Sequence, residues 1–265
     1  MVRPTVICLH ASGGTGAQWQ ALAHELGSDF DVAAPNLYGH GATPAWPGPA
    51  SDIVAADAAR IASMVASAAG TVHLVGHSYG GAIALRVALL RSRSVASIAV
   101  YEPVTMRVLF DYNARHRAAA EVAEIAGNVR RALNGGDCEQ AAERFVDYWS
   151  GAGQWGRLAP AQRSALARRM PVIDAHFKSL RNDAMRLRDY ARVGAPVLYL
   201  GGRDSRASVR RIAELMAYAL PDVERFTFGG MGHLGPITHE QAVARRIAGF
   251  VRRQAAGSWV HRKAA

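Results

Sequence analysis

This sequence contains few cysteines, and it lacks the common nucleotide-binding motifs where they would be expected. Cys8 and Cys138 are the only two cysteines among 265 residues. A disulfide framework or a cysteine zinc site needs more cysteines at characteristic spacings, so neither is expected. No G-x-x-x-x-G-K-[ST] occurs, and no G-x-G-x-x-G follows the first predicted strand. We therefore expect no metal site, no phosphate-binding loop and no cofactor.

Long apolar runs are absent as well. No run approaches the roughly 18 residues that a membrane-spanning helix needs. The first ten residues, MVRPTVICLH, hold too short an apolar stretch for a secretory signal and no small-residue cleavage site. We expect a soluble, cytoplasmic protein with no membrane span.

Acidic residues are few compared with basic ones. The chain has 21 Asp and Glu against 31 Lys and Arg, a formal net charge of +10. Such an excess can indicate an anionic partner. However, the arginines are scattered, and no basic stripe with interleaved aromatic residues is present. We interpret the charge as a solvated arginine-rich surface and expect a small-molecule substrate rather than nucleic acid. Nothing in the sequence indicates the oligomeric state.

Short apolar runs alternate with helical stretches at both ends of the chain. The predicted strands are 5–9, 30–34, 72–76, 95–101, 196–200 and 224–228, and the last predicted helix runs from about 239 to 254. Strands that are apolar throughout and separated by helices are typical of a parallel sheet covered on both faces. The predicted fold is α/β, with a mostly parallel central sheet of about six strands flanked by helices.

The alternation is interrupted in the middle of the chain, where only helical stretches are found. We therefore predict a core made of 1–104 and 193–256 and a helical cap, or lid, at 105–192. Residues 257–265, which include Trp259, are predicted to be a loosely held tail.

The strongest local motif is Gly76-His77-Ser78-Tyr79-Gly80, which fits G-x-S-x-G between a predicted strand and a predicted helix. The glycines are needed because the serine backbone in such a turn is strained and the flanking chains pass too closely for a Cβ. The turn would present the Ser78 hydroxyl at the carboxyl edge of the sheet. Ser78 is therefore the candidate nucleophile.

With this motif in this context, the chain resembles the α/β-hydrolase superfamily over nearly its whole length. The helical segment 105–192 occupies the position of that family's cap domain. Because the chain begins at the first parallel strand, without the family's frequent N-terminal hairpin, the resemblance implies a sheet of about six strands. With serine as the nucleophile, it implies an esterase, a lipase or a C–C-bond hydrolase.

A serine hydroxyl needs a base to take its proton. His233 lies in a glycine-rich loop just after the last predicted strand, where the family's catalytic histidine is found, and that loop shares the carboxyl edge with Ser78. His239 ranks second because it falls at the start of the last predicted helix.

Two carboxylates could orient this base. Asp204 follows the predicted strand 196–200 in a loop that resembles the family's strand–G-x-x-D loop, and it gives the chain order Ser78, Asp204, His233. Glu102 ends the preceding strand, from which some members of the superfamily take their acid. We prefer Asp204 and keep Glu102 as the alternative acid or as a pocket residue.

The oxyanion of the reaction needs two backbone N–H donors. The residue after the nucleophile, Tyr79, would supply one of them. Ser12 would supply the other, since the segment around it resembles the family's His-Gly-x loop, with Ala11 where glycine is usual. The glycines that follow allow the chain to approach the site closely.

These residues predict acyl transfer by a carboxylesterase-like hydrolase that acts on a small, partly apolar ester. Trp149 and Trp155 are the candidate lid contacts. A C–C-bond hydrolase or a thioesterase could use the same triad. A non-catalytic small-molecule receptor on this fold is the alternative of another class.

Overall fold

The structure, a computed structural model, describes the backbone of residues 2–263 and the side chains of residues 2–257. One sheet has the strand order β2-β1-β3-β4-β5-β6, and all neighbouring strands are parallel. The strands are β1 (Thr5–Leu9), β2 (Asp31–Ala33), β3 (Val72–His77), β4 (Val95–Tyr101), β5 (Val197–Gly202) and β6 (Val223–Phe228). The predicted α/β fold with a parallel sheet of about six strands is confirmed.

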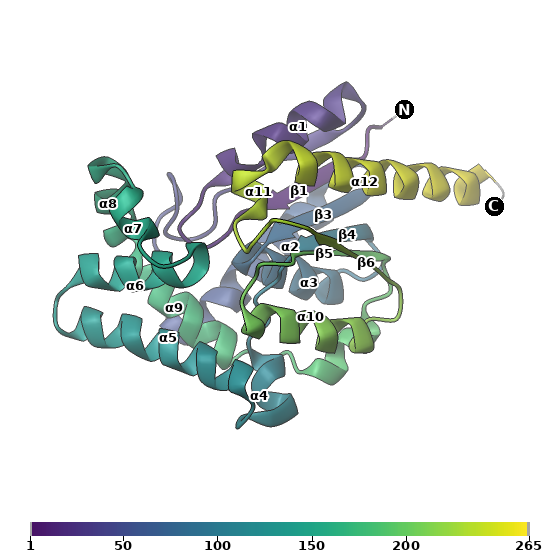
Figure 1. Ribbon diagram of the computed structural model, residues 1–265. Coiled ribbons are helices and arrows are strands. Elements are labelled where there is room, and N and C mark those ends of the chain that lie inside the picture. The colour runs from purple at the N-terminus through teal and green to yellow at the C-terminus, as the bar shows by residue number, and fades with distance from the viewer. Residues whose placement is uncertain (1, 264–265) are drawn as a thin grey trace.

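Helices cover both faces of the sheet (Figure 1). On one face lie α1 (Gln20–Leu26) and α12 (Glu240–Lys263), and on the other lie α2 (Ile53–Ser67), α3 (Tyr79–Leu90) and α10 (Ala207–Ala219). All six residues of β3 are buried. Because side chains alternate along a strand, Leu74 packs in the core cluster of α2 and α3, whereas Val75 packs in the cluster of α1 and α12. This two-sided burial explains the continuous apolar runs.

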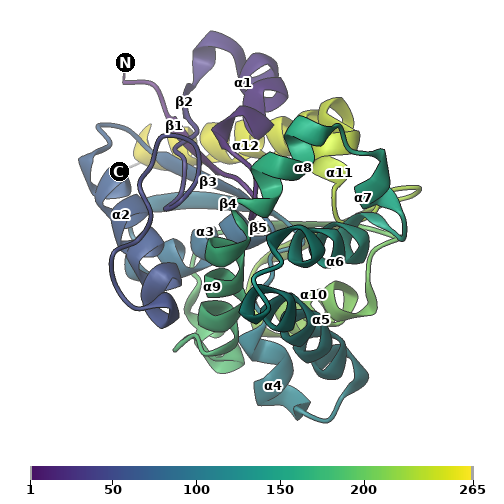
Figure 2. The ribbon, with the colours of Figure 1, turned by 90° about the vertical axis from the view of Figure 1, so that its left-hand side faces the viewer.

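The segment between β4 and β5 is helical throughout. It contains α4 (Arg107–Asn113), α5 (Arg117–Asn134), α6 (Cys138–Ser150), α7 (Gln154–Arg157), α8 (Pro160–Ala167), α9 (Met170–Arg181) and the 3-10 turn η4 (Leu187–Arg192). We call residues 105–192 the helical insertion. It lies across the carboxyl end of the sheet (Figure 1 and Figure 2).

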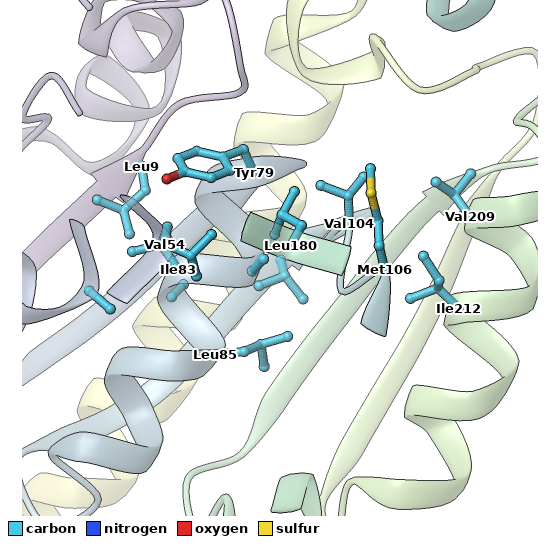
Figure 3. Close-up of a cluster of buried hydrophobic side chains, with 14 of the residues drawn as sticks. Leu9, Val54, Tyr79, Ile83, Leu85, Val104, Met106, Leu180, Val209 and Ile212 are labelled. Carbon is cyan, nitrogen blue, oxygen red and sulfur yellow. The ribbon is translucent and has the colours of Figure 1, made fainter. Parts of the chain in front are cut away.

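Helix α9 is anchored in the core of the sheet domain. Its Leu180 belongs to the same buried cluster as Tyr79 and Ile83 of α3, and Figure 3 shows Leu180 among these side chains and Val104. In addition, the hydroxyl of Ser179 accepts from the backbone N–H of Val54 in α2 at 3.2 Å. The insertion is therefore packed onto the core and is not attached only through its two connections.

The C-terminal boundary differs from the prediction. Helix α12 continues to Lys263 instead of ending near residue 254, so the predicted tail 257–265 is helical as far as the structure describes it. Residues 264 and 265 and the side chain of Trp259 lie outside the described residues. The run from 239 to 263 contains no proline, and its two glycines, Gly249 and Gly257, do not force an earlier end. None of the helices in the described part of the chain is both long and apolar enough to cross a bilayer.

Candidate active site

Ser78 lies in the turn between β3 and α3, where its φ of 54° and ψ of −115° are strained for a residue other than glycine. The neighbouring glycines allow this turn. A Cβ on Gly76 would lie 2.4 Å from the carbonyl oxygen of Gly80, and a Cβ on Gly80 would lie 2.3 Å from that of Leu9. The Ser78 N–H donates to the carbonyl of Tyr101 at 3.0 Å. The turn thus fixes Ser78 at the carboxyl edge of the sheet, where it lines a cavity.

His233 connects Ser78 to a carboxylate. Its Nε2 lies 2.9 Å from Ser78 Oγ, and its Nδ1 lies 2.7 Å from Oε2 of Glu102. The side chains of His233 and Glu102 are each only 3% exposed. A carboxylate accepts hydrogen bonds, so Nδ1 carries the proton and Nε2 is left to accept from the Ser78 hydroxyl. This is the arrangement that a general base requires.

The carboxylate in contact with His233 is Glu102, so our preference for Asp204 at this position was wrong. Glu102 follows β4 directly, with a φ of 43° that turns the side chain toward the His233 loop. Its other oxygen, Oε1, accepts from the backbone N–H of Gly202 at 2.7 Å and from the Ser205 hydroxyl. Three donors therefore hold this buried carboxylate.

Asp204 is exposed, and its backbone N–H donates to the carbonyl of Met231 at 2.9 Å. The end of β5 and the loop after it still contribute to the site, through Gly202 and Ser205 respectively, which donate to Glu102. Two neighbouring strands end at the same sheet edge, and the loop geometry selects which of their carboxylates reaches the histidine.

The loop after β1 is held so that the Ser12 N–H has a defined direction. The carbonyl of Ala11 accepts from His10 Nδ1 at 2.8 Å and from the Gly14 N–H at 3.0 Å. In a planar trans peptide the N–H points opposite to the carbonyl, so these contacts also orient the Ser12 N–H. Ser12 lines the same cavity as Ser78 and His233.

A second hydrogen-bond chain links three loops of the site. Gln18 Oε1 accepts from the Ala11 N–H at 3.2 Å, and its Nε2 donates to His77 Nδ1 at 3.1 Å. The Nε2 of His77 donates to the carbonyl of His233 at 2.8 Å. The network joins the loop of Ser12, the residue before Ser78 and the His233 backbone. No local pattern in the sequence identifies Gln18 or His77 as part of it.

Several histidines in the core and beside the site are buried and neutral. Burial lowers the pKa of His10 to about 3 and that of His73 to about 4. Burial also lowers the pKa of His77 and His176 well below the ordinary value, and that of His40 to a smaller extent. Nearby Asp57 accepts from the Tyr79 hydroxyl at 2.8 Å, and burial raises its pKa to about 6.

The cavity beside Ser78 has a volume of about 400 Å³. Its lining is mainly apolar. Most of the apolar side chains come from the helical insertion, and the sheet domain adds Val104 after β4 and Leu234 and Ile237 of the His233 loop. The apolar lining residues of the insertion are Met106, Phe145, Val146, Trp149, Leu158, Ala165, Leu166, Ile173, Phe177 and Leu180. Such a lining favours a ligand with a substantial apolar part.

The two tryptophans singled out from the sequence have different surroundings. Trp149 lines the cavity, and its ring stacks on His233 with centroids 4.0 Å apart and planes 27° apart. Trp155 is buried in the core cluster and is not among the cavity-lining residues, so its expected lid contact was wrong. His239, the second-ranked base, is exposed and pairs with the hydroxyl of Thr238.

Comparison with known proteins places these observations in a family. The family model described as "Alpha/beta hydrolase family" matches residues 6–246. This chain belongs to the alpha/beta hydrolase family. As a member of that family, with esterases among its relatives, it is a hydrolase.

Two curated relatives of this alpha/beta hydrolase are informative. It is 30% identical over 258 residues to a pimeloyl-[acyl-carrier protein] methyl ester esterase of Chromobacterium violaceum, a match that covers 95% of this chain and 96% of that protein. It is 35% identical over 99 residues to lipase LipV of Mycobacterium tuberculosis, but that match covers only 37% of this chain and 36% of the lipase.

Among solved structures, a thermophilic esterase from Thermogutta terrifontis superposes with a TM-score of 0.70 at 19% identity, covering 96% of this chain and 91% of that chain. At this identity the likeness concerns the fold.

Proposed function

We propose that this alpha/beta hydrolase cleaves a carboxylic ester of a small, largely apolar acid through an acyl-enzyme on Ser78. The observation that carries the proposal is the hydrogen-bond chain from Ser78 through His233 to Glu102, which opens on an apolar cavity. The full-length relative from Chromobacterium violaceum, named as a methyl ester esterase, supports an ester with a small alcohol part.

In the proposed reaction, His233 Nε2 takes the proton of Ser78 Oγ as the oxygen attacks the ester carbonyl carbon. The backbone N–H groups of Ser12 and Tyr79 stabilise the oxyanion of the tetrahedral intermediate. His233 then gives the proton to the departing alcohol. Water, deprotonated by the same nitrogen, attacks the acyl-enzyme, and His233 passes the proton to Ser78 Oγ as the bond to the acyl group breaks and the acid leaves. Glu102 holds the Nδ1–H tautomer and stabilises the charged ring at each step.

We further propose that the helical insertion, residues 105–192, is a cap that shapes the acyl pocket. The apolar side chains that it contributes to the cavity support this role. Trp149 would then be a lid contact that also limits the motion of the His233 ring, on which it stacks.

The test is a panel of p-nitrophenyl esters and of matched acyl thioesters with acyl chains of increasing length. We expect the wild-type protein to hydrolyse the esters, with a preference for chains that the cavity can hold, and we expect Ser78→Ala to lose about 10⁴-fold or more of kcat. Faster cleavage of every thioester than of its ester would replace the ester assignment with a thioesterase. Ligand binding without turnover of any member would identify a receptor and refute the enzymatic proposal.

A further inference from the structure

Helix α9 and the residue before it contact the loop that carries Ser12. Arg169 Nη1 donates to the carbonyl of Gly13 at 2.7 Å, and His176 Nδ1 lies 2.8 Å from Ser12 Oγ. Arg169 and His176 are seven residues apart, two helical turns, so they lie on the same side of the helix. Ile173, between them, also lines the cavity.

The same helix surface reaches the second expected oxyanion donor. The ring of His176 stacks on the ring of Tyr79 with centroids 3.7 Å apart and planes 9° apart. One side chain of the insertion therefore touches both Ser12 and Tyr79, the two residues whose backbone N–H groups the proposed mechanism uses. His176 is 1% exposed, so this contact is fully enclosed.

The fit between the loop and the insertion leaves little freedom. Gly13 has a φ of +79°, and a Cβ at this position would lie 2.9 Å from Leu166 Cδ1 of α8. The Gly13 N–H donates to His40 Nε2 at 3.0 Å, and the ring of His40 stacks on that of His176 with centroids 5.4 Å apart. Both polar groups of the Gly13 backbone are thus held by side chains, one of them from the insertion.

We propose that Arg169 and His176 are positioning residues that hold the loop after β1, which carries Ser12 and Gly13, in its catalytic conformation. This inference rests on the proposed function. The helical insertion then has two roles: it lines the pocket, and it fixes the Ser12 peptide relative to Ser78. Preorganised donors give their full effect only when they are aimed at the developing oxyanion, and misplacement by about 1 Å can cost up to about 100-fold in rate.

The variants should remove each contact with little other change. His176→Phe keeps the ring on Tyr79 but removes the hydrogen bond to Ser12, and Ser12→Ala removes the same bond from the other side while keeping the backbone N–H. Arg169→Ala removes the contact with Gly13. The matched controls are Arg168→Ala, an exposed neighbour, and Lys178→Ala, an exposed position of α9.

The readouts are kcat and KM for p-nitrophenyl acetate, the inhibition constant of a trifluoromethyl ketone, and thermal stability. A trifluoromethyl ketone adds to Ser78 and places an oxyanion beside the backbone N–H groups of Ser12 and Tyr79. The affinity of the inhibitor therefore depends on how well these two donors are positioned. We expect His176→Phe and Arg169→Ala to lose about 10-fold or more of kcat and to bind the inhibitor more weakly by a similar factor. KM and Tm should change little, and both controls should resemble the wild type.

Ser12→Ala combined with His176→Phe should be no worse than either single change, because both remove one interaction. If the wild-type enzyme depends on Ser78 but both His176→Phe and Arg169→Ala keep the wild-type kcat, this inference is overturned. The proposed function would then still stand. A lower Tm and an altered KM, together with unchanged inhibitor affinity, would assign these residues a purely structural role. That result would also overturn this inference. The absence of Ser78-dependent turnover in the wild type would overturn both proposals.

Discussion

Replacing Glu102 with Gln tests the orientation of His233 most sharply, because the surroundings determine how the amide must sit. Oε1 of Glu102 accepts from the Gly202 N–H and from the Ser205 hydroxyl. The amide oxygen of Gln has to take this place, since an NH₂ group there would face two donors. The NH₂ group is then placed against His233 Nδ1, 2.7 Å from the present carboxylate oxygen.

The consequence is the wrong tautomer of His233. An NH₂ group donates to Nδ1, so the ring proton moves to Nε2, which can no longer accept from Ser78. In serine proteases this change from carboxylate to amide lowers kcat by about 10⁴-fold, equivalent to about 5.4 kcal/mol at about 1.36 kcal/mol per factor of ten. Because Gln matches Glu in size, we expect the fold, and KM to a first approximation, to be preserved.

The assay is steady-state hydrolysis of p-nitrophenyl acetate, with Asp204→Asn as the matched control. Asp204 is exposed, so we expect this variant to retain kcat within about threefold, a range typical of surface changes away from the site. A large loss in Asp204→Asn combined with near wild-type kcat in Glu102→Gln would refute the assignment of Glu102.

Three further predictions concern the surroundings of the site. Trp149→Ala removes the ring that stacks on His233, and we expect kcat/KM for esters to fall about threefold to tenfold, as the loss of one aromatic pair implies. Gln18→Ala leaves the Ala11 N–H and His77 without their partner, so we expect the free energy of unfolding in urea to fall by about 1–3 kcal/mol. Finally, we expect this free energy to decrease as the pH is lowered from 7 towards 4, measured by urea unfolding at each pH.

The sign of the pH effect follows from the buried histidines. Burial lowers the folded-state pKa of His10 to about 3 and of His73 to about 4, whereas an unfolded histidine titrates near about 6.5. Below that pH the unfolded chain binds more protons than the folded one, and each extra proton costs up to about 1.4 kcal/mol of stability per pH unit. Asp57 has the opposite effect, because its pKa is raised to about 6 and the folded chain therefore binds this proton before the unfolded chain does. It is a single group against several histidines.

The controls differ among these three predictions. Gln20→Ala, at an exposed position of α1, should leave the unfolding free energy unchanged, and an equal loss in both glutamine variants would remove the argument for the network. Unchanged kcat/KM in Trp149→Ala would mean that the stacking does not influence the base. Constant stability between pH 7 and pH 5 would contradict the neutral state of the buried histidines.

Much of the fold and the positions of two candidate site residues could be predicted because their signals are local. The strand runs around Leu74 and Leu198 are apolar on both faces, which only a sheet covered on two sides requires. Ser78 lies in the G-x-S-x-G motif, and the glycines of this motif indicate a strained turn. His233 lies in a loop after a strand, and parallel strands bring such loops to one edge, where the structure places its Nε2 2.9 Å from Ser78 Oγ.

The remaining features depend on contacts that no local pattern encodes. Asp204 and Glu102 both follow strands at the same edge, and the choice between them is made by the φ of 43° at Glu102 and by the donors from the β5 loop. His176 meets Ser12 across 164 positions of the chain. Nothing near His176 in the sequence distinguishes it from an ordinary buried residue of an amphipathic helix.

The assignment of Ser78 as the nucleophile is tested most directly by finding where a fluorophosphonate attaches. The wild-type protein is treated with the reagent, digested and sequenced by mass spectrometry, while loss of p-nitrophenyl acetate hydrolysis is followed in parallel. We expect a single stoichiometric adduct on Ser78, formed at the rate at which activity is lost, and no labelling of Ser78→Ala. Labelling of another residue, or full inactivation with Ser78 unmodified, would refute Ser78 as the nucleophile.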